Sequence, residues 1–350
     1  MILNETPVRT SKNFLINNVE VKDLKLHTKL KPFKNITFIG QDKFISSNVS
    51  KDFNLAFGLK KELEDEVKNY SNVNLKIVNS TKQKDETMID LKLDDENDLL
   101  IDNIEIVSEE NAKGTVIIKY EEDKDVKGYH NGIVRCLAKK DSELTVVLIN
   151  LLNQNTKNFL SVQNEFEENS KITFIVVDFG GSESITNLYT NQEGNASENN
   201  IKCIYLGKDD QRFDLNYIAE LRGEKTKVDI DVQGALKDHS KKNFKGTIDF
   251  KRGAKKAVGN EAENCMLLSD TARSIALPML LCSEEDVEGN HSSSAGKIGE
   301  KELFYVMTRG INKKEAMKLM VRANFNNILE SIKNPKYRED IIKELDSKLD

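Results

Sequence analysis

The 350-residue chain contains no tryptophan, four prolines, four histidines and four cysteines. No two cysteines form a Cys-x-x-Cys pair and the histidines lie far apart, whereas a closed structural zinc site needs four ligands. So few thiols in so long a chain also argue against a disulfide framework and favour a reducing, cytoplasmic location. We therefore expect neither a structural zinc site nor a disulfide-rich fold.

Long apolar runs are also missing. No stretch of about 18 or more apolar residues occurs, so no membrane-spanning helix is expected. The opening residues MILNETPVRTSKNF lack the basic and apolar segments of a secretory signal. The net charge is −6 with both signs interspersed, so no basic face for nucleic acid is predicted. The expected partners therefore include neither a membrane nor nucleic acid.

Nucleotide-binding and nucleophile motifs are absent as well. The run from Gly289 to Lys297 reads GNHSSSAGK, in which six residues separate the glycines and Ile298 follows the lysine. A phosphate-binding P-loop has four residues between its glycines and a Ser or Thr after its lysine. No Gly-x-Ser-x-Gly elbow occurs either. We therefore expect no catalytic residues and no ATP hydrolysis by this chain.

The chain divides into three predicted regions. Residues 1–102 form an N-terminal mixed or helical region, in which charge pairing and apolar spacing predict a helix from Lys51 to Tyr70. Residues 103–280 form a β-rich core. Residues 281–350 begin with a polar loop and continue as helices.

A degenerate repeat runs through the core. Short β-branched or alternating runs recur with a period of about 28 residues, in the range typical of solenoid repeats, and Ser142 aligns with Ser170. The runs are KGTVIIKY (113–120), DSELTVVLI (141–149), NSKITFIVV (169–177), NNIKCIYLG (199–207) and KTKVDIDVQG (225–234). Each is too short to bury its apolar face alone, whereas stacked coils would bury a continuous core. The repeat predicts a mainly β fold, a parallel β-solenoid; an antiparallel β-sandwich is the alternative.

Three helices are predicted after the core. The first runs from Glu300 to Arg309 and is closed by Gly310, and Asn312 with Glu315 forms a capping-box-like start to the second. The predicted apolar face of the second helix consists of Ala316, Leu319, Met320 and Ala323. The third begins at Asn334-Pro335, and its stripe consists of Ile341, Ile342, Leu345 and Leu349. These stripes could pack on the core or bind a partner helix.

One run carries the strongest functional signal. DVEGNHSSSAGKIGEKELFYVMTRGI (286–311) passes from a polar loop containing His291 into an amphipathic helix. It resembles the C-terminal signature of the SufB/SufD family, the scaffold subunits of the SUF iron–sulfur cluster assembly system, whose usual form is close to DVKCSHGATxGxLDxxxLFYLxSRGI. The residues in register are Asp286, Val287, His291, Gly296, Leu303, Phe304, Tyr305, Arg309, Gly310 and Ile311.

Other segments extend the resemblance. YHNGIVRCLAKKDSELTVVLINLL (129–152) is similar to a segment of SufD-like proteins, and NETPVRTSKNF (4–14) looks like the N-terminal start of the family. GTIDFKRGAKKAVGNEAENCMLLSDTARSIALPMLLC (246–282) resembles the segment that precedes the family's C-terminal signature. The C-terminal run is the specific part of the match, and the middle segments add support to it.

The resemblance implies a right-handed parallel β-helix between N- and C-terminal helical regions, in agreement with the repeat. It implies a non-enzymatic scaffold that pairs with a SufB-like subunit, or with itself, and docks a SufC-like ABC-type ATPase through its C-terminal region. The candidate docking residues are Leu303, Phe304, Tyr305 and Arg309. A cysteine desulfurase would take part indirectly. No cofactor would be bound stably, although an iron–sulfur cluster could form transiently at the subunit interface.

His291 falls on the SufD histidine of that interface, and a neutral imidazole can bind iron, so it is also a tentative metal ligand. Without the resemblance, the residues favour a polar loop histidine that caps the following helix. The family cysteine two residues before this histidine is Gly289 here. The place of SufB's assembly cysteine falls near Glu263, with Cys265 displaced by two. These departures favour a SufD-like over a SufB-like chain.

Two single residues and two other functions complete the predictions. Cys265 has apolar neighbours and is predicted to be a buried, unreactive thiol, and His130 is predicted to be a turn residue before the strand-like run GIVRCLA. A β-helix enzyme acting on polysaccharide would use paired carboxylates or a calcium–Arg arrangement in a surface groove, but it would also be expected to carry a secretion signal and aromatic sugar platforms. A purely structural solenoid would differ from the scaffold in capturing no ATPase.

Overall fold

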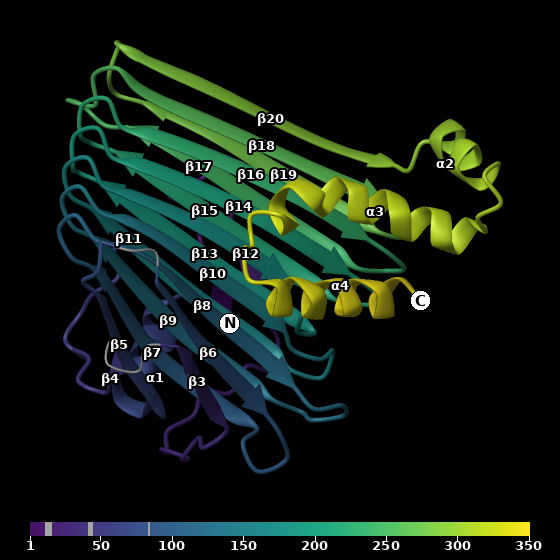
Figure 1. Ribbon diagram of the computed structural model, residues 1–350, viewed down its shortest axis with the longest axis horizontal. Helices are drawn as coiled ribbons and strands as arrows, with labels where there is room; N and C mark the ends of the chain where they lie inside the picture. Colours follow the sequence, from purple (N-terminus) through teal and green to yellow (C-terminus); the bar gives the residue numbers. More distant parts are fainter. Residues whose placement is uncertain (11–15, 41–44, 83–84) are drawn as a thin grey trace.

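The computed structural model describes residues 1–10, 16–40, 45–82 and 85–350. Within these residues the chain winds into a parallel β-solenoid of about eight turns, which confirms the predicted fold class and excludes the antiparallel sandwich. Each turn contributes one strand to each of two facing sheets, sheet I and sheet II, and helices lie at the chain's C-terminal end (Figure 1).

In spatial order, the described part of sheet I contains β3 (Ile36–Gly40), β6 (Asp85–Leu93), β8 (Lys113–Glu122), β10 (Glu143–Leu151), β12 (Lys171–Asp178), β14 (Glu198–Gly207), β16 (Lys227–Leu236), β18 (Ala257–Leu267) and β20 (Val287–Lys297). Sheet II contains β4 (Ile45–Ser46), β5 (Val73–Asn79), β7 (Leu99–Ser108), β9 (Tyr129–Ala138), β11 (Lys157–Phe166), β13 (Glu183–Gln192), β15 (Arg212–Leu221), β17 (Lys241–Phe250) and β19 (Arg273–Cys282). A short antiparallel pair, β1 (Ile2–Leu3) and β2 (Val19–Glu20), precedes them.

The sequence repeat corresponds to one of the two sheets. Its five runs are β8, β10, β12, β14 and β16, which are successive parallel neighbours in sheet I. The turns differ in length. In sheet II, Lys157 is the register partner of Glu183, one short turn further along the chain, whereas Lys241 and its partner Arg273 are separated by a longer turn. Parallel pairing begins at β5 and continues to β20, so it extends beyond residues 103–280 at both ends.

One corner of the solenoid is built from left-handed backbone. The corner residues with positive φ, between 54° and 60°, are Asn111, Asp141, Asn169, Ala196, Lys225 and Lys256. Asn and Asp tolerate this conformation better than other non-glycine residues. The corners also stack, since the N–H of Asp141 donates to the carbonyl of Glu168 at 3.1 Å and the N–H of Asn169 to that of Asn195 at 2.8 Å. This stacking fixes the turns one above another.

The apolar core fills the space between the two sheets. Alternate residues of each strand point inward, so that Phe174 and Ile201 from sheet I and Leu188 and Leu215 from sheet II are fully buried in one continuous cluster. The outer faces of the middle strands are also covered, which explains their nearly uninterrupted apolar runs.

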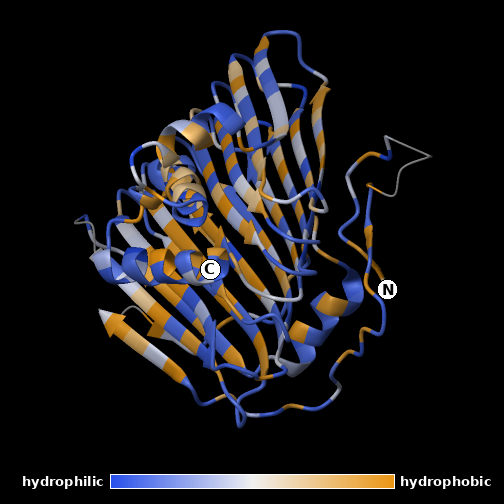
Figure 2. Cartoon of the chain, turned by 90° about the vertical axis from the view of Figure 1, so that its right-hand side faces the viewer, coloured by the Kyte–Doolittle hydropathy of each residue, from blue (hydrophilic) through white to orange (hydrophobic). Residues whose placement is uncertain are grey.

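The N-terminal region covers the outer face of sheet II, opposite to the C-terminal helices (Figure 2). Helix α1 (Lys61–Tyr70) packs Leu63 and Val67 against Ile101 of β7 and Ile133 of β9. The predicted helix from Lys51 was too long, because the chain before Lys61 is not helical.

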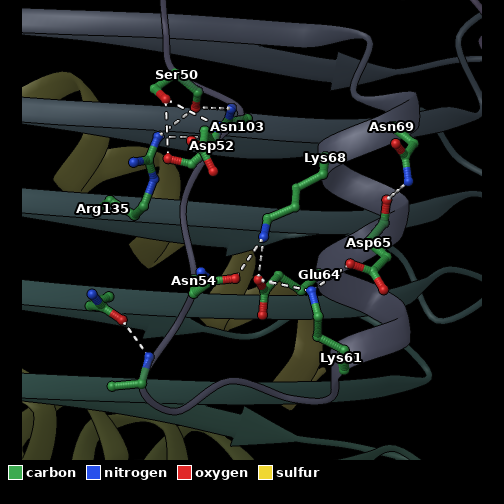
Figure 3. Close-up of polar contacts among 12 residues, drawn as sticks. Ser50, Asp52, Asn54, Lys61, Glu64, Asp65, Lys68, Asn69, Asn103 and Arg135 are labelled. Carbon is green, nitrogen blue, oxygen red and sulfur yellow. Dashed lines mark hydrogen bonds and ion pairs between the residues drawn. The ribbon is translucent and has the colours of Figure 1, made fainter.

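The segment before α1 follows the sheet surface and is fastened to it (Figure 3). Arg135 of β9 donates to the carbonyl of Ser50 at 3.0 Å, and its guanidinium lies 4.2 Å from the ring centroid of Phe53. Asn103 of β7 donates to the same carbonyl at 3.2 Å. These tertiary contacts hold residues 50–53 in place and outweigh their helical sequence pattern.

The C-terminal chain forms α2 (Glu300–Met307), α3 (Lys313–Leu329) and α4 (Pro335–Leu349). Helices α3 and α4 lie on the outer face of sheet I, whereas α2 stands beside the end of β20 (Figure 1). Gly310 has φ +84° after α2, and the side chain of Asn312 accepts a hydrogen bond from the N–H of Glu315 at 3.0 Å. The predicted N-cap of the second helix is therefore confirmed, whereas α2 ends at Met307, two residues before the predicted end at Arg309. No helix in the described residues is long and apolar enough to cross a membrane.

The buried face of α3 differs from the prediction. Leu319 is 47 % exposed and Ala323 is exposed, whereas Val321 and Phe325 are fully buried against sheet I. Of the predicted stripe, Ala316 is fully buried and Met320 is partly buried. The buried face is therefore rotated from the predicted one but overlaps it, because several faces of α3 carry apolar residues and the sheet selects one of them. On α4, Ile341, Leu345 and Leu349 are buried and Ile342 is partly buried, as predicted.

Candidate functional site

The last turn of the solenoid is open. β20 is the final strand of sheet I and β19 that of sheet II, and in the described structure each is hydrogen-bonded to a strand on one side only. Almost every residue of β20 is exposed, and on β19 Ile275 is 47 % exposed. A strand edge of this length presents unpaired N–H and C=O groups and can pair with another chain. The open end is therefore a candidate interaction surface.

His291 lies in this last turn. It belongs to the eleven-residue strand β20 and not to the predicted polar loop. The small polar residues around it have little strand preference of their own, and their extended conformation follows from parallel pairing with β18, which places His291 beside Glu261. The His291 side chain is exposed, as a residue acting at an interface should be. Its predicted role in cluster assembly remains a prediction.

Polar groups line the interior directly behind His291. Glu263 of β18 is 1 % exposed and accepts hydrogen bonds from Lys242 at 2.6 Å, from the hydroxyl of Tyr205 at 2.9 Å and from Ser293 of β20 at 2.8 Å. The position near which SufB's assembly cysteine falls is thus occupied here by a carboxylate in a buried ion pair. Its contact with Ser293 joins the last turn to the interior.

Glu261 lies on the same face of β18, two residues before Glu263. It is 3 % exposed, and both of its carboxylate oxygens lack a hydrogen-bond partner among the described residues. Burial, with a smaller contribution from the charge of Glu263, raises the pKa of Glu261 to about 8. This carboxyl group is therefore held in its neutral form near pH 7, since no nearby group offsets the cost of ionising it.

Cys265 continues the same inward face. It is 4 % exposed, which confirms the prediction of a buried cysteine, and burial raises the pKa of its thiol. Cys282 at the end of β19 is exposed, and its Sγ lies 2.8 Å from the carbonyl oxygen of Glu284. No group of three or more His, Cys, Asp or Glu residues in the described chain is arranged to hold a metal ion.

Helix α2 presents the predicted ATPase-docking residues. None of its residues is buried, and Phe304 and Tyr305 are 68 % and 60 % exposed. Arg309 donates to the hydroxyl of Tyr305 at 2.7 Å, and Leu303 is half-buried. This surface can contact another protein without unpacking the solenoid.

The sequence prediction for His130 was wrong. His130 is a fully buried strand residue, not a turn residue, and its ring nitrogens lie 2.6 Å from Asp102 and 2.5 Å from Asn158. Asn158 donates to Ser184, whose hydroxyl donates to Asp178. His130 and Asn158 are one solenoid turn apart and adjacent in register. Polar residues recurring at the solenoid period were the signal that could have identified this network.

The comparisons with known proteins agree with this architecture. Residues 91–324, more than half of the chain, match the family model described as SUF system FeS cluster assembly, SufBD core domain. The chain belongs to the SufBD family. This membership supports a role in iron–sulfur cluster assembly.

Individual SufBD relatives match shorter stretches. The chain is 32% identical over 140 residues to the iron–sulfur cluster assembly protein SufD of Bacillus subtilis, across 40% of this chain and 31% of that protein. It is 33% identical over 129 residues to an iron–sulfur cluster assembly SufBD family protein of Pyrococcus horikoshii, across 37% of this chain and 28% of that protein. The chain thus matches less than a third of the length of either relative.

Proposed function

We propose that this SufBD family chain is a non-enzymatic scaffold subunit of a SUF-type complex. It pairs through the open end of its solenoid with a SufB-like subunit or a second copy, and it docks a SufC-like ATPase through α2. Iron and sulfur are its cargo, and His291 contributes to the interface where the cluster forms. The observation that carries the proposal is the position of His291 on β20, the edge strand that pairs only with β18 in the described chain.

The open end supports the pairing part of the proposal. Joining β19 and β20 to strands of another chain would satisfy their free backbone groups and cover Ile275. The same contact would bring His291 next to groups of the partner. A cluster ligated across such an interface needs few donors from either subunit.

The conformation of the Gly289–Lys297 run supports a non-enzymatic role. These residues lie in the extended strand β20, so their N–H groups do not form the curved loop that surrounds a phosphate. ATP hydrolysis is therefore assigned to the partner ATPase. The purified chain alone should show no ATP binding by calorimetry at micromolar concentrations.

The exposed face of α2 provides a direct test of docking. Removing residues 300–350 would also remove α3 and α4 from sheet I, so point substitutions are the better experiment. Phe304→Ala combined with Tyr305→Ala should reduce capture of a SufC-like ATPase in a pull-down without lowering thermal stability, because both side chains are exposed. Leu319→Ala, an exposed apolar change on α3, is the matched control. Unchanged capture by the double variant would show that α2 is not the docking surface.

Substitution of His291 tests the assembly function. In a complex reconstituted with a SufB-like subunit, the ATPase, a cysteine desulfurase and Fe²⁺, His291→Ala should lower the cluster yield measured by visible absorption and leave subunit association intact. His239→Ala is the control, because His239 is also exposed but lies at a corner of the solenoid. Equal yields from the His291 variant and the parent would remove His291 from the assembly site.

A further inference from the structure

Glu261 is an exception among the buried carboxylates near the open end. Glu263 faces Lys242 at 2.6 Å and Asp214 faces Lys245 at 2.6 Å, so each of these buried charges is paired. Both oxygens of Glu261 are buried without a partner in the described chain. Buried polar groups almost always have hydrogen-bond partners, and an orphaned carboxylate calls for an explanation.

The Glu261 carboxyl group occupies a space left by a glycine. A Cβ atom added to Gly246 of β17, in the opposite sheet, would lie 2.3 Å from Oε2 of Glu261. The Glu261 side chain therefore extends across the interior to sheet II. Any larger residue at position 246 would displace the carboxyl group, so the absence of a side chain at Gly246 provides the space that this group occupies.

Only the last turn of the solenoid separates this carboxyl group from solvent. In register, Glu261 pairs with His291 on β20 and Gly246 pairs with Pro278 on β19. Paired residues on adjacent strands lie about 4.8 Å apart and project to the same side of the sheet. The side chain of His291 thus belongs to the layer directly above Glu261, and it is exposed.

We propose that Glu261 and His291 together form a binding site for a divalent transition-metal ion, Fe²⁺ in the assembly reaction, at the open end of the solenoid. The choice of iron rests on the function proposed above, whereas the site rests on the orphaned carboxylate and its register with His291. A carboxylate and an imidazole are donors that Fe²⁺, Mn²⁺, Co²⁺ and Zn²⁺ all accept, and binding of the ion would release to solvent the proton that Glu261 holds near pH 7. Glu263 is not included, because its oxygens already accept bonds from Lys242, Tyr205 and Ser293.

Two donors suit a cargo site better than a structural one. A structural metal site is closed by four protein ligands, and the described chain gathers no such group. With two protein donors, the other coordination positions stay open to water or to groups of the partner subunit. The ion can then be received from solution and passed on at the interface.

The test is calorimetric titration of the purified, metal-free full-length chain with Fe²⁺ under anaerobic conditions. Binding of Co²⁺, monitored by its visible absorption, gives a second readout that is independent of cluster assembly. The parent should bind one ion per chain. Glu261→Gln and His291→Ala should each weaken binding by about tenfold or more, a loss at least as large as that of an outer-shell partner.

Matched variants control for general loss of charge. Glu288→Gln removes an exposed carboxylate from the same strand as His291, and His239→Ala removes an exposed histidine elsewhere. Both should bind as the parent does. Glu261→Gln should fold, because it replaces an unpaired buried acid with a neutral side chain of the same shape, and His291→Ala alters an exposed position that the fold does not depend on.

The proposal is overturned if the parent does not bind Fe²⁺, if Glu261→Gln binds as tightly as the parent, or if Glu288→Gln is weakened equally. If the space beside Glu261 instead receives a cationic side chain of the partner, the isolated parent chain should not bind Fe²⁺. If the complex assembles clusters while Fe²⁺ binding is unaffected by Glu261→Gln, this inference fails and the proposed function stands. If the parent binds Fe²⁺ at Glu261 and His291 but captures neither a partner subunit nor the ATPase, this inference stands and the proposed function fails.

Discussion

At the scale of single residues, this protein buries charges whose partners come from distant parts of the chain. Lys245 donates to Asp214 at 2.6 Å and to the carbonyl of Asn4 at 2.8 Å, and the Asn4 side chain also donates to Asp214 at 2.7 Å. The N-terminal segment thereby closes over an ion pair on the outer face of sheet II. Such a pair costs desolvation when formed, and breaking it leaves a buried charge unpaired.

Removing one partner of this pair should be strongly destabilising. Lys245→Met leaves the Asp214 carboxylate buried without its cation, so the free energy of unfolding in urea should fall by about 3–5 kcal/mol. Lys227→Met is the control, because Lys227 pairs with Glu198 at an exposed position, where an ion pair contributes about 0–1 kcal/mol. Similar losses in the two variants would show that the pair at Asp214 is solvated.

The raised pKa of Asp178 leads to a prediction about how the stability of the fold depends on pH. Burial raises its pKa from the ordinary value of 3.8 to about 6, against the opposing hydrogen bonds from Ser184 and Asn150. Because the folded state holds this proton more tightly than the unfolded state, the associated stability is fully present below pH 3.8 and is lost as the pH rises through about 6.

Asp178→Asn should remove this dependence. The stability of the parent relative to the variant, measured by urea unfolding at several pH values, should fall between about pH 4 and pH 6. The fall should be about 3 kcal/mol, at about 1.4 kcal/mol for each unit of pKa change. Parallel curves for the two proteins across this range would mean that Asp178 titrates normally.

At the scale of elements, the C-terminal helices have two different tasks. Helices α3 and α4 complete the hydrophobic packing on the outer face of sheet I, where Phe325 lies 6.2 Å from Phe179, centroid to centroid. Helix α2 buries none of its residues. The buried apolar residues of α3 and α4 therefore serve the fold, while the exposed residues of α2 are free to contact a partner.

Substitutions on α3 distinguish its buried face from the predicted one. Phe325→Ala should lower the free energy of unfolding by about 3–5 kcal/mol, because it leaves a cavity against the sheet. Leu319→Ala, at a position of the predicted apolar stripe that is 47 % exposed, should cost less than about 1 kcal/mol. Chemical denaturation of both variants checks the assignment. A larger loss of unfolding free energy for Leu319→Ala than for Phe325→Ala would show that the predicted face is the buried one.

At the scale of the whole molecule, the solenoid is covered on the outer faces of both sheets but open at its last turn. The N-terminal segment and α1 cover sheet II, and α3 and α4 cover sheet I (Figure 2). Within the described chain, β19 and β20 keep a free edge. At the other end of the described solenoid, β3 and β4 are also paired on one side only. The exposed His291 and Ile275 make the last turn the expected place for association under the proposed function.

A charged substitution at that end should disrupt association. Ile275→Asp places a carboxylate on the free strand β19, so it should weaken pairing with a SufB-like subunit or a second copy, as measured by light scattering coupled to gel filtration. Leu30→Asp is the control, because Leu30 is 62 % exposed in the N-terminal region. If the Ile275 variant pairs as the parent does, the interface lies elsewhere.

The amino-acid sequence by itself determined the repeating units and the ends of several elements. The five runs that recur once per turn are neighbours in sheet I, because parallel coils of similar length place equivalent residues side by side. Local capping geometry made the start of α3 at Asn312 predictable, and the signature around His291 identified the family.

Only the tertiary structure decided which polar residues meet inside the solenoid. The length of a turn varies along sheet II, and a shift of one residue moves a side chain from the interior to the outer face. The period alone therefore could not reveal that His130 is buried or that Lys242 pairs with Glu263. Nor could it show that Glu261, one strand behind His291, lies in the interior without a partner in the described chain, since burial depends on every layer packed around a residue.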